Sequence, residues 1–171
     1  FPYHDYPLNQ VRGIHHSIIS FMSDMHPIRN HDEAKDFIKR TDLAKDVYAG
    51  VLDGLQRQAA AGIFAPEFVY AHVIDQLNEM IDYSYDEHPL YTQFMKKAEL
   101  LDISSEELAT LEARLILSIE NSVTPGFILL RDFMVSTRDK ANPDHGIWSQ
   151  PNGDEFYKLR IRTYTTTDYS P

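Results

Sequence analysis

The sequence predicts an all-α fold, an irregular bundle of antiparallel helices with no significant sheet. Seven glycines and nine prolines are few for 171 residues, and they fall between long stretches whose apolar residues recur every three or four positions. That period is typical of amphipathic helices. Strand-like composition is confined to residues 163–167, which are too few and too isolated to build a sheet. We therefore expect one helical domain over residues 1–171.

The first elements expected are an extended lead-in over residues 1–8 and a helix from about residue 9 to residue 25. Prolines at positions 2 and 7 favour the lead-in, because the residue before a proline is disfavoured in a helix. His26-Pro27 should end the helix. Its predicted apolar face comprises Val11, Ile14, Ile18, Phe21, Met22 and Met25.

A second helix should begin near Asn30, a good N-cap with Glu33 in capping-box position, and run to about residue 61. A break is expected near residues 41–42. Gly62 fits the left-handed position that often follows a helix. The predicted apolar stripe consists of Ala44, Val47, Tyr48, Val51, Leu52 and Leu55.

Prolines mark the next two helix starts. Pro66 is expected at the first position of a third helix, where its missing N–H costs nothing, and Pro89 should open a short helix that ends near Ala98. The buried face of the third helix is predicted to carry Val69, Val73, Leu77, Met80 and Ile81.

The longest periodic run follows a capping box at residues 104–107 and continues to Met134. Pro125 lies inside this run and should kink the helix or split it in two. Residues 142–153 hold two prolines and two glycines and are expected to form a loop. A last helix should cover about residues 154–164.

Charge and composition exclude several classes of protein. The net charge is −10 with no basic cluster, which argues against nucleic-acid binding, since that affinity comes chiefly from basic neutralisation of phosphates. The absence of cysteine rules out disulfides, thiolate metal sites and a cysteine nucleophile. No apolar run approaches the ~20 residues of a membrane span. We therefore expect no nucleic-acid partner and no transmembrane segment in this chain.

Motifs for catalysis or metal binding are lacking. The chain has no His-Glu-x-x-His, no Gly-x-Ser-x-Gly and no glycine-rich phosphate loop. His72 with Asp75 or Gln76 has helical spacing, but a histidine near one polar partner is far more often structural. The paired acids have no sign of burial. No catalytic residue, metal ligand or cofactor is predicted for this chain, which we do not expect to be an enzyme alone.

The candidate site surrounds Trp148, the only tryptophan, which lies in the proline- and glycine-containing loop. It could anchor the loop to the bundle or form a wall of a peptide-binding cleft. Arg160 and Tyr164 are four residues apart and share a helix face. Arg160 could hold a substrate carboxylate, or pair with a nearby acid. The cleft candidates are Trp148, Tyr157, Arg160, Tyr164, Thr165, Thr166 and Thr167.

The last two residues, Ser170 and Pro171, form a helix-start signature with no helix after it. We expect that the chain is a fragment whose next helix has been removed, although a tail ending in Ser-Pro by coincidence is the alternative.

Three segments resemble one bacterial family, the proteins of unknown function numbered 885, and they occur in the same order and at similar spacing. Residues 146–153 match a Gly-x-Trp-x-x-Pro-x-Gly pattern with Tyr157 nearby, and residues 164–171 match the Thr-Thr-Thr segment that follows it. The early segment is matched by Asn9-Gln10, Gly13 and His26-Pro27-Ile28-Arg29. The resemblance covers nearly the whole chain.

The resemblance implies a longer parent protein that is often exported or lipid-anchored. The C-terminal part of such proteins carries a motif similar to that of zinc peptidases, in which two histidines hold the metal and a glutamate activates its water. The chain would then be a non-catalytic scaffold and substrate-cleft portion, with the missing C-terminal portion and a peptide substrate as partners. Zinc would lie in that missing portion.

Two alternatives remain open. The chain could instead be a stand-alone helical adaptor that docks another protein, in which case it should bury its own apolar faces. The resemblance implies the cell envelope or periplasm, with a lipid anchor in a missing N-terminal segment; the alternative is the cytoplasm.

Overall fold

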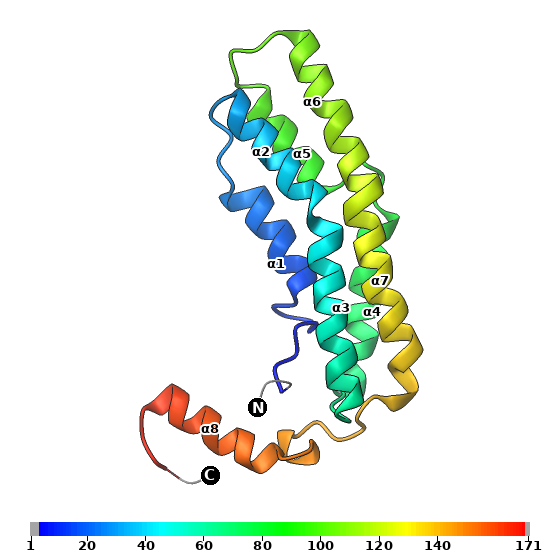
Figure 1. Cartoon of the computed structure of the whole chain (residues 1–171), viewed down its shortest axis with the longest axis vertical. Helices are drawn as coiled ribbons and strands as arrows, with labels where there is room; N and C mark the ends of the chain where they lie inside the picture. Colours follow the sequence, from blue (N-terminus) through cyan, green and yellow to red (C-terminus); the bar gives the residue numbers. More distant parts are fainter. Residues whose placement is uncertain (1–3, 170–171) are drawn as a thin grey trace.

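The computed structural model describes residues 4–169, and they form an elongated bundle of helices (Figure 1). One helix, α8, extends away from the lower end of the bundle, close to the N-terminal segment. The all-α prediction is confirmed, and the described residues contain no strand, only a single bridge between Pro66 and Asn142.

The elements, in chain order, are α1 (Ile14–Ser20), the π-helical turn η1 (Phe21–Met25), α2 (His31–Asp42), α3 (Ala44–Ala60), α4 (Glu67–Asp82), α5 (Pro89–Ala98), α6 (Ser105–Ser118), the π-helical turn η2 (Ile119–Val123), α7 (Thr124–Thr137), the 3-10 turns η3 (Arg138–Lys140) and η4 (Ile147–Ser149), and α8 (Gly153–Thr165).

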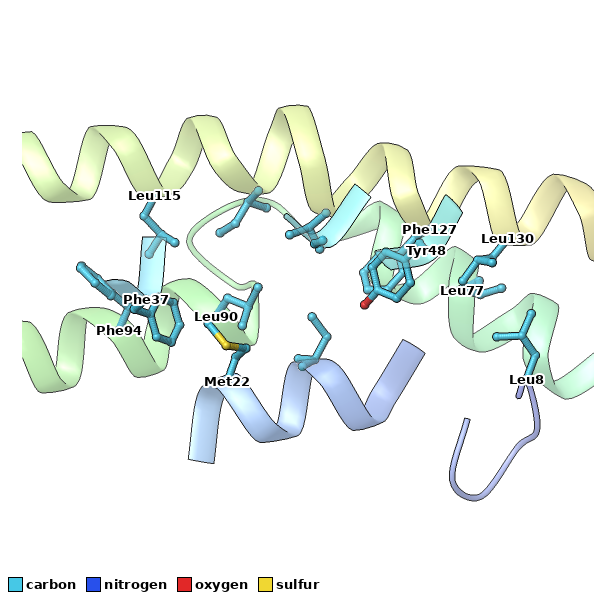
Figure 2. Close-up of a cluster of buried hydrophobic side chains, with 14 of the residues drawn as sticks. Leu8, Met22, Phe37, Tyr48, Leu77, Leu90, Phe94, Leu115, Phe127 and Leu130 are labelled. Atoms are coloured by element: carbon cyan, nitrogen blue, oxygen red, sulfur yellow. The ribbon is translucent and has the colours of Figure 1, made fainter. Parts of the chain in front are cut away.

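The core lies between the long rod formed by α6, η2 and α7 and the helices packed against it. α6 packs on α2, and α7 packs on both α3 and α4. Figure 2 shows aromatic side chains at two levels of this core. Phe37 and Phe94 lie with ring centres 5.3 Å apart, and Tyr48 and Phe127 lie 5.1 Å apart. All four side chains are fully buried.

The rod is long and apolar enough, by length and composition alone, to cross a membrane. Together with the 3-10 turn η3 it runs over 36 residues, Ser105–Lys140, whereas no apolar run near the length of a membrane span was expected in this chain. Its buried residues recur at helical spacing and belong to the core that α2, α3 and α4 share. This one-sided burial is typical of the central helix of a bundle. The buried residues of the rod include Leu111, Leu115, Ile119, Val123, Phe127, Leu130 and Met134.

The predicted helix ends are largely confirmed. The Asn30 side chain accepts from the Glu33 N–H at 2.9 Å, and Ser104 and Glu107 form a complete capping box. Gly62 has a φ of 75°. The box at Asn30 is incomplete, because the Glu33 carboxylate accepts from the Arg29 N–H instead. Pro66 is the N-cap of α4 and not, as expected, its first helical residue.

The first helix was predicted to begin too early. The Asn9 side chain accepts from the N–H groups of Val11 and Arg12, at 3.0 and 2.7 Å, and so forms a turn that ends before the helix. α1 therefore begins at Ile14, and Val11 is 72% exposed. The Asn side chain competes with the main chain for these donors.

The predicted apolar faces also contained three residues that the structure exposes. Phe21 and Met25 belong to η1, and its wider turn changes the direction in which successive side chains point, compared with an α-helix. Val47 is 46% exposed on α3, beside the buried Tyr48. Periodicity alone located the stripe but not its edges.

Both predicted interruptions are present. α2 and α3 are separated at Leu43, within two residues of the expected break. The rod changes from α-helix to π-helix just before Pro125, where the Thr124 N–H bonds to Ile119 O. Pro125 has no N–H to donate, and the wider turn before it accommodates its ring. The strand-like residues 163–167 instead end α8.

Candidate binding cleft

An open cleft is lined by residues of the N-terminal segment and of α8. Both segments lie at the lower end of the bundle (Figure 1). Its volume is about 530 Å³. A second, mostly apolar cavity behind Tyr6 has a volume of only about 20 Å³, too small for a ligand larger than water. The cleft is lined by His4, Asp5, Tyr6 and Asn9 from the N-terminal segment and by Ile147, Phe156, Tyr157 and Arg160 from η4 and α8.

Two glycines shape the turn that begins α8. A Cβ on Gly153 would lie 1.8 Å from the Ile147 carbonyl oxygen, and a Cβ on Gly146 would lie 2.0 Å from Nε1 of Trp148. Gly153 therefore requires glycine, because main-chain atoms approach it closely, whereas the contact at Gly146 is with a side chain. The Gly-x-Trp-x-x-Pro-x-Gly segment is a compact turn after which α8 leads away from the bundle. Close packing within the turn accounts for its glycines.

The N-terminal segment is tied to this turn and to the bundle. The His4 ring lies 2.6 Å from the Pro151 carbonyl, which can only accept, so His4 Nε2 carries the hydrogen. The same ring contacts Phe156 with centres 4.8 Å apart. Gln58 of α3 donates to the Asp5 carbonyl. These contacts fix both walls of the cleft.

Arg160 is the cationic residue of the cleft. Its Nη2 donates to the Tyr164 hydroxyl at 2.6 Å, and its guanidinium carbon lies 4.7 Å from the Tyr164 ring centre. The Asp5 carboxylate lies 3.7 Å from Nη1. Across the cleft, burial raises the pKa of the Tyr6 phenol, and the nearby Tyr70 adds to that rise.

The predicted candidates separate into two groups. Tyr157 and Arg160 line the cleft, and Tyr164 orients Arg160. Trp148 does not line the cleft, and its 64% exposure shows that it is not a buried anchor either. The threonines lie at the end of α8, outside the cleft lining, where Thr166 adopts a left-handed φ of 56° and the hydroxyls of Thr165 and Thr167 are 2.6 Å apart.

Sequence reasoning missed the opposite wall. His4, Asp5 and Tyr6 lie in the predicted extended lead-in, more than 140 residues from Pro151, and only the fold brings them beside α8. Phe156 was also missed. Its position one turn before Arg160 on α8 was the available signal.

No metal-binding cluster is found among residues 4–169: no three His, Asp or Glu side chains there are placed to hold an ion. His15 and His88 are fully buried instead. Burial lowers the pKa of each to about 4, although a hydrogen bond from His15 to Gln76 opposes part of that shift. The zinc site that the family resemblance implies belongs to the C-terminal portion of the parent and not to these residues.

The fold and the cleft together define the class of protein: an all-α bundle with an open cleft beside a projecting helix. The sequence profile described as "Bacterial protein of unknown function (DUF885)" matches residues 2–171, so the chain belongs to that bacterial family. No curated protein matches the chain significantly.

A solved structure has the same fold. It is a "putative lipoprotein" from Colwellia psychrerythraea, with a TM-score of 0.93 and 24% sequence identity. The similarity covers 97% of this chain but only 28% of the Colwellia protein.

Proposed function

We propose that this chain is the non-catalytic helical scaffold of a longer zinc-metallopeptidase-like protein and forms one wall of its substrate cleft. The observation that carries the proposal is the cleft itself, which joins apolar and aromatic walls to the oriented cation of Arg160. Such a combination suits a peptide end, because an arginine fork recognises a carboxylate and apolar walls receive a side chain.

The metallopeptidase part of the proposal rests on the family resemblance and on the neighbour's length. Because the chain spans 28% of the Colwellia protein, a parent of similar length would have room for a metal-binding portion that the described residues lack. The lipoprotein description of that neighbour supports a cell-envelope location, with a lipid anchor on the parent.

Binding to the full chain of residues 1–171 tests the cleft. We expect N-acetyl-Ala-Phe with a free carboxylate to bind, and its C-terminal amide to bind about tenfold more weakly. The variant Arg160→Gln should remove this difference in affinity, because it loses a charge-assisted hydrogen bond to the carboxylate. Equal binding of the two peptides by the unmodified chain would remove the support for a carboxylate site.

Assays of the parent test the chemistry. The purified parent should contain zinc and hydrolyse peptides in a chelator-sensitive way, whereas residues 1–171 should show no turnover. Turnover by the chain alone would overturn the non-catalytic assignment. A parent without zinc would overturn the metallopeptidase assignment and leave the adaptor hypothesis.

A further inference from the structure

The guanidinium of Arg160 is oriented but only partly used. The Tyr164 ring lies 4.7 Å and the Phe156 ring 5.8 Å from the guanidinium carbon, which restricts the plane of the group. Within residues 4–169, its hydrogen bond to the Tyr164 hydroxyl is the only one that the guanidinium makes. Further N–H groups therefore remain for a ligand.

Asp5 stands in front of those N–H groups without bonding to them. Its Oδ1 lies 3.7 Å from Arg160 Nη1, beyond hydrogen-bond distance, and its side chain is 81% exposed. The main chain of Asp5 is held separately, because its carbonyl accepts from the buried Gln58 side chain. The carboxylate can therefore turn away from Arg160 while the segment keeps its place.

We infer that Asp5 is a built-in competitor for the carboxylate site at Arg160, which a ligand carboxylate must displace. This inference rests on the proposed function and narrows its ligand class. The ligand carries a free carboxylate next to an apolar or aromatic side chain, because Ile147, Phe156 and Tyr157 line the cleft around the guanidinium. The peptide C-terminus meets both requirements.

The strength of the Asp5 contact sets the size of the effect. An exposed ion pair at this distance is weak, whereas a carboxylate bound through two N–H groups of an arginine is stronger. Asp5 therefore reduces ligand affinity modestly and does not close the site. Removing its charge should tighten carboxylate binding by about two- to fivefold, the fold-change that corresponds to a weak exposed pair.

The test compares Asp5→Asn with Asp154→Asn in the full chain, using calorimetric titration with N-acetyl-Ala-Phe and with its C-terminal amide. Asp154 is an exposed acid in the first turn of α8 and does not line the cleft, so its variant removes the same charge elsewhere. We expect Asp5→Asn to bind the free carboxylate two- to fivefold more tightly, to leave amide binding unchanged, and to keep its circular dichroism. Asp154→Asn should bind both peptides like the unmodified chain. Asp5→Ala provides a second variant, with the same expected gain.

The outcomes separate the inference from the proposed function. If Arg160→Gln removes the preference for the carboxylate but the Asp5 variants bind no more tightly than Asp154→Asn, the competitor role is wrong and the carboxylate site stands. If neither the unmodified chain nor the Asp5 variants prefer the carboxylate to the amide, the carboxylate site falls, and the competitor role falls with it.

Discussion

The hydroxyl of Ser122 donates to the main-chain carbonyl of Asp42 at 2.6 Å and so joins the π-helical turn η2 to the end of α2. The same hydroxyl accepts from the Lys45 N–H at 3.0 Å. Leu43, the N-cap of α3, has no side chain that can bond to the first turn. Ser122, 77 residues away from Lys45, therefore caps α3 from across the core.

Replacing this hydroxyl should loosen the junction. We expect Ser122→Ala to lower the free energy of unfolding by about 1–3 kcal/mol, because it leaves partly buried main-chain groups without a partner. Ser136→Ala is the matched control, since Ser136 is exposed and bonds only within α7, to Phe133 O. Urea unfolding of both variants checks this, and equal stability would show that water replaces Ser122.

Gly126 should not tolerate a methyl group. A Cβ at this position would lie 2.4 Å from Cδ2 of the fully buried Tyr48. We expect Gly126→Ala to destabilise the protein by about 1–3 kcal/mol despite the better helix propensity of alanine, because the core is overpacked.

Gly54 gives the opposite expectation. It lies within α3 and has nothing within 4 Å of its ideal Cβ, so Gly54→Ala should stabilise the protein by about 0.4–1 kcal/mol. Thermal melting of both glycine variants measures the contrast. Shifts of the same sign would contradict the packing described for Tyr48.

Stability should fall as the pH falls from about 6.5 to about 4. Burial lowers the folded-state pKa of His15 and His88 to about 4, while the unfolded chain takes up these protons at the ordinary value of about 6.5. The unfolded state then binds more protons, so the stabilisation is present above pH 6.5 and is lost as the pH approaches 4. Each histidine contributes on the order of 3 kcal/mol to this loss.

His88→Asn should flatten that dependence while keeping the cap, because asparagine can also accept from the Leu90 N–H as His88 Nδ1 does at 3.2 Å. The matched control variant is His72→Asn, at an exposed position of α4. Unfolding free energies between pH 4 and 7 provide the measurement. A His88→Asn profile identical to that of the unmodified protein would rule out this role for His88.

The two glycines of the Trp148 turn should respond differently to alanine. At Gly153 the new Cβ would collide with main-chain atoms of Ile147, so α8 should lose its fixed start. At Gly146 the collision is with the exposed indole of Trp148, which can turn away. Hydrogen exchange of α8 should rise in Gly153→Ala, whereas Gly146→Ala should chiefly shift the fluorescence of Trp148. Faster exchange in both variants would mean that the indole is also needed.

How far the sequence predicted the site depends on the distance between its residues. Arg160 and Tyr164 were paired correctly, because a spacing of four places two side chains on one helix face and their hydrogen bond is local. The family motif likewise located the turn before α8. Asp5 was not found, because its approach to Arg160 depends on where the N-terminal segment meets α8.

The sequence by itself determined most of the helices, the N-caps at Asn30 and Ser104 and the interruptions at Leu43 and Pro125, since capping, proline geometry and apolar periodicity act within one or two turns. Only the tertiary structure decided which polar groups contact residues that are distant in the sequence. Ser122 caps a helix 77 residues away, and His4 and Asp5 form a cleft wall with α8. Such contacts carry no periodic signal, because each depends on how whole helices pack against one another.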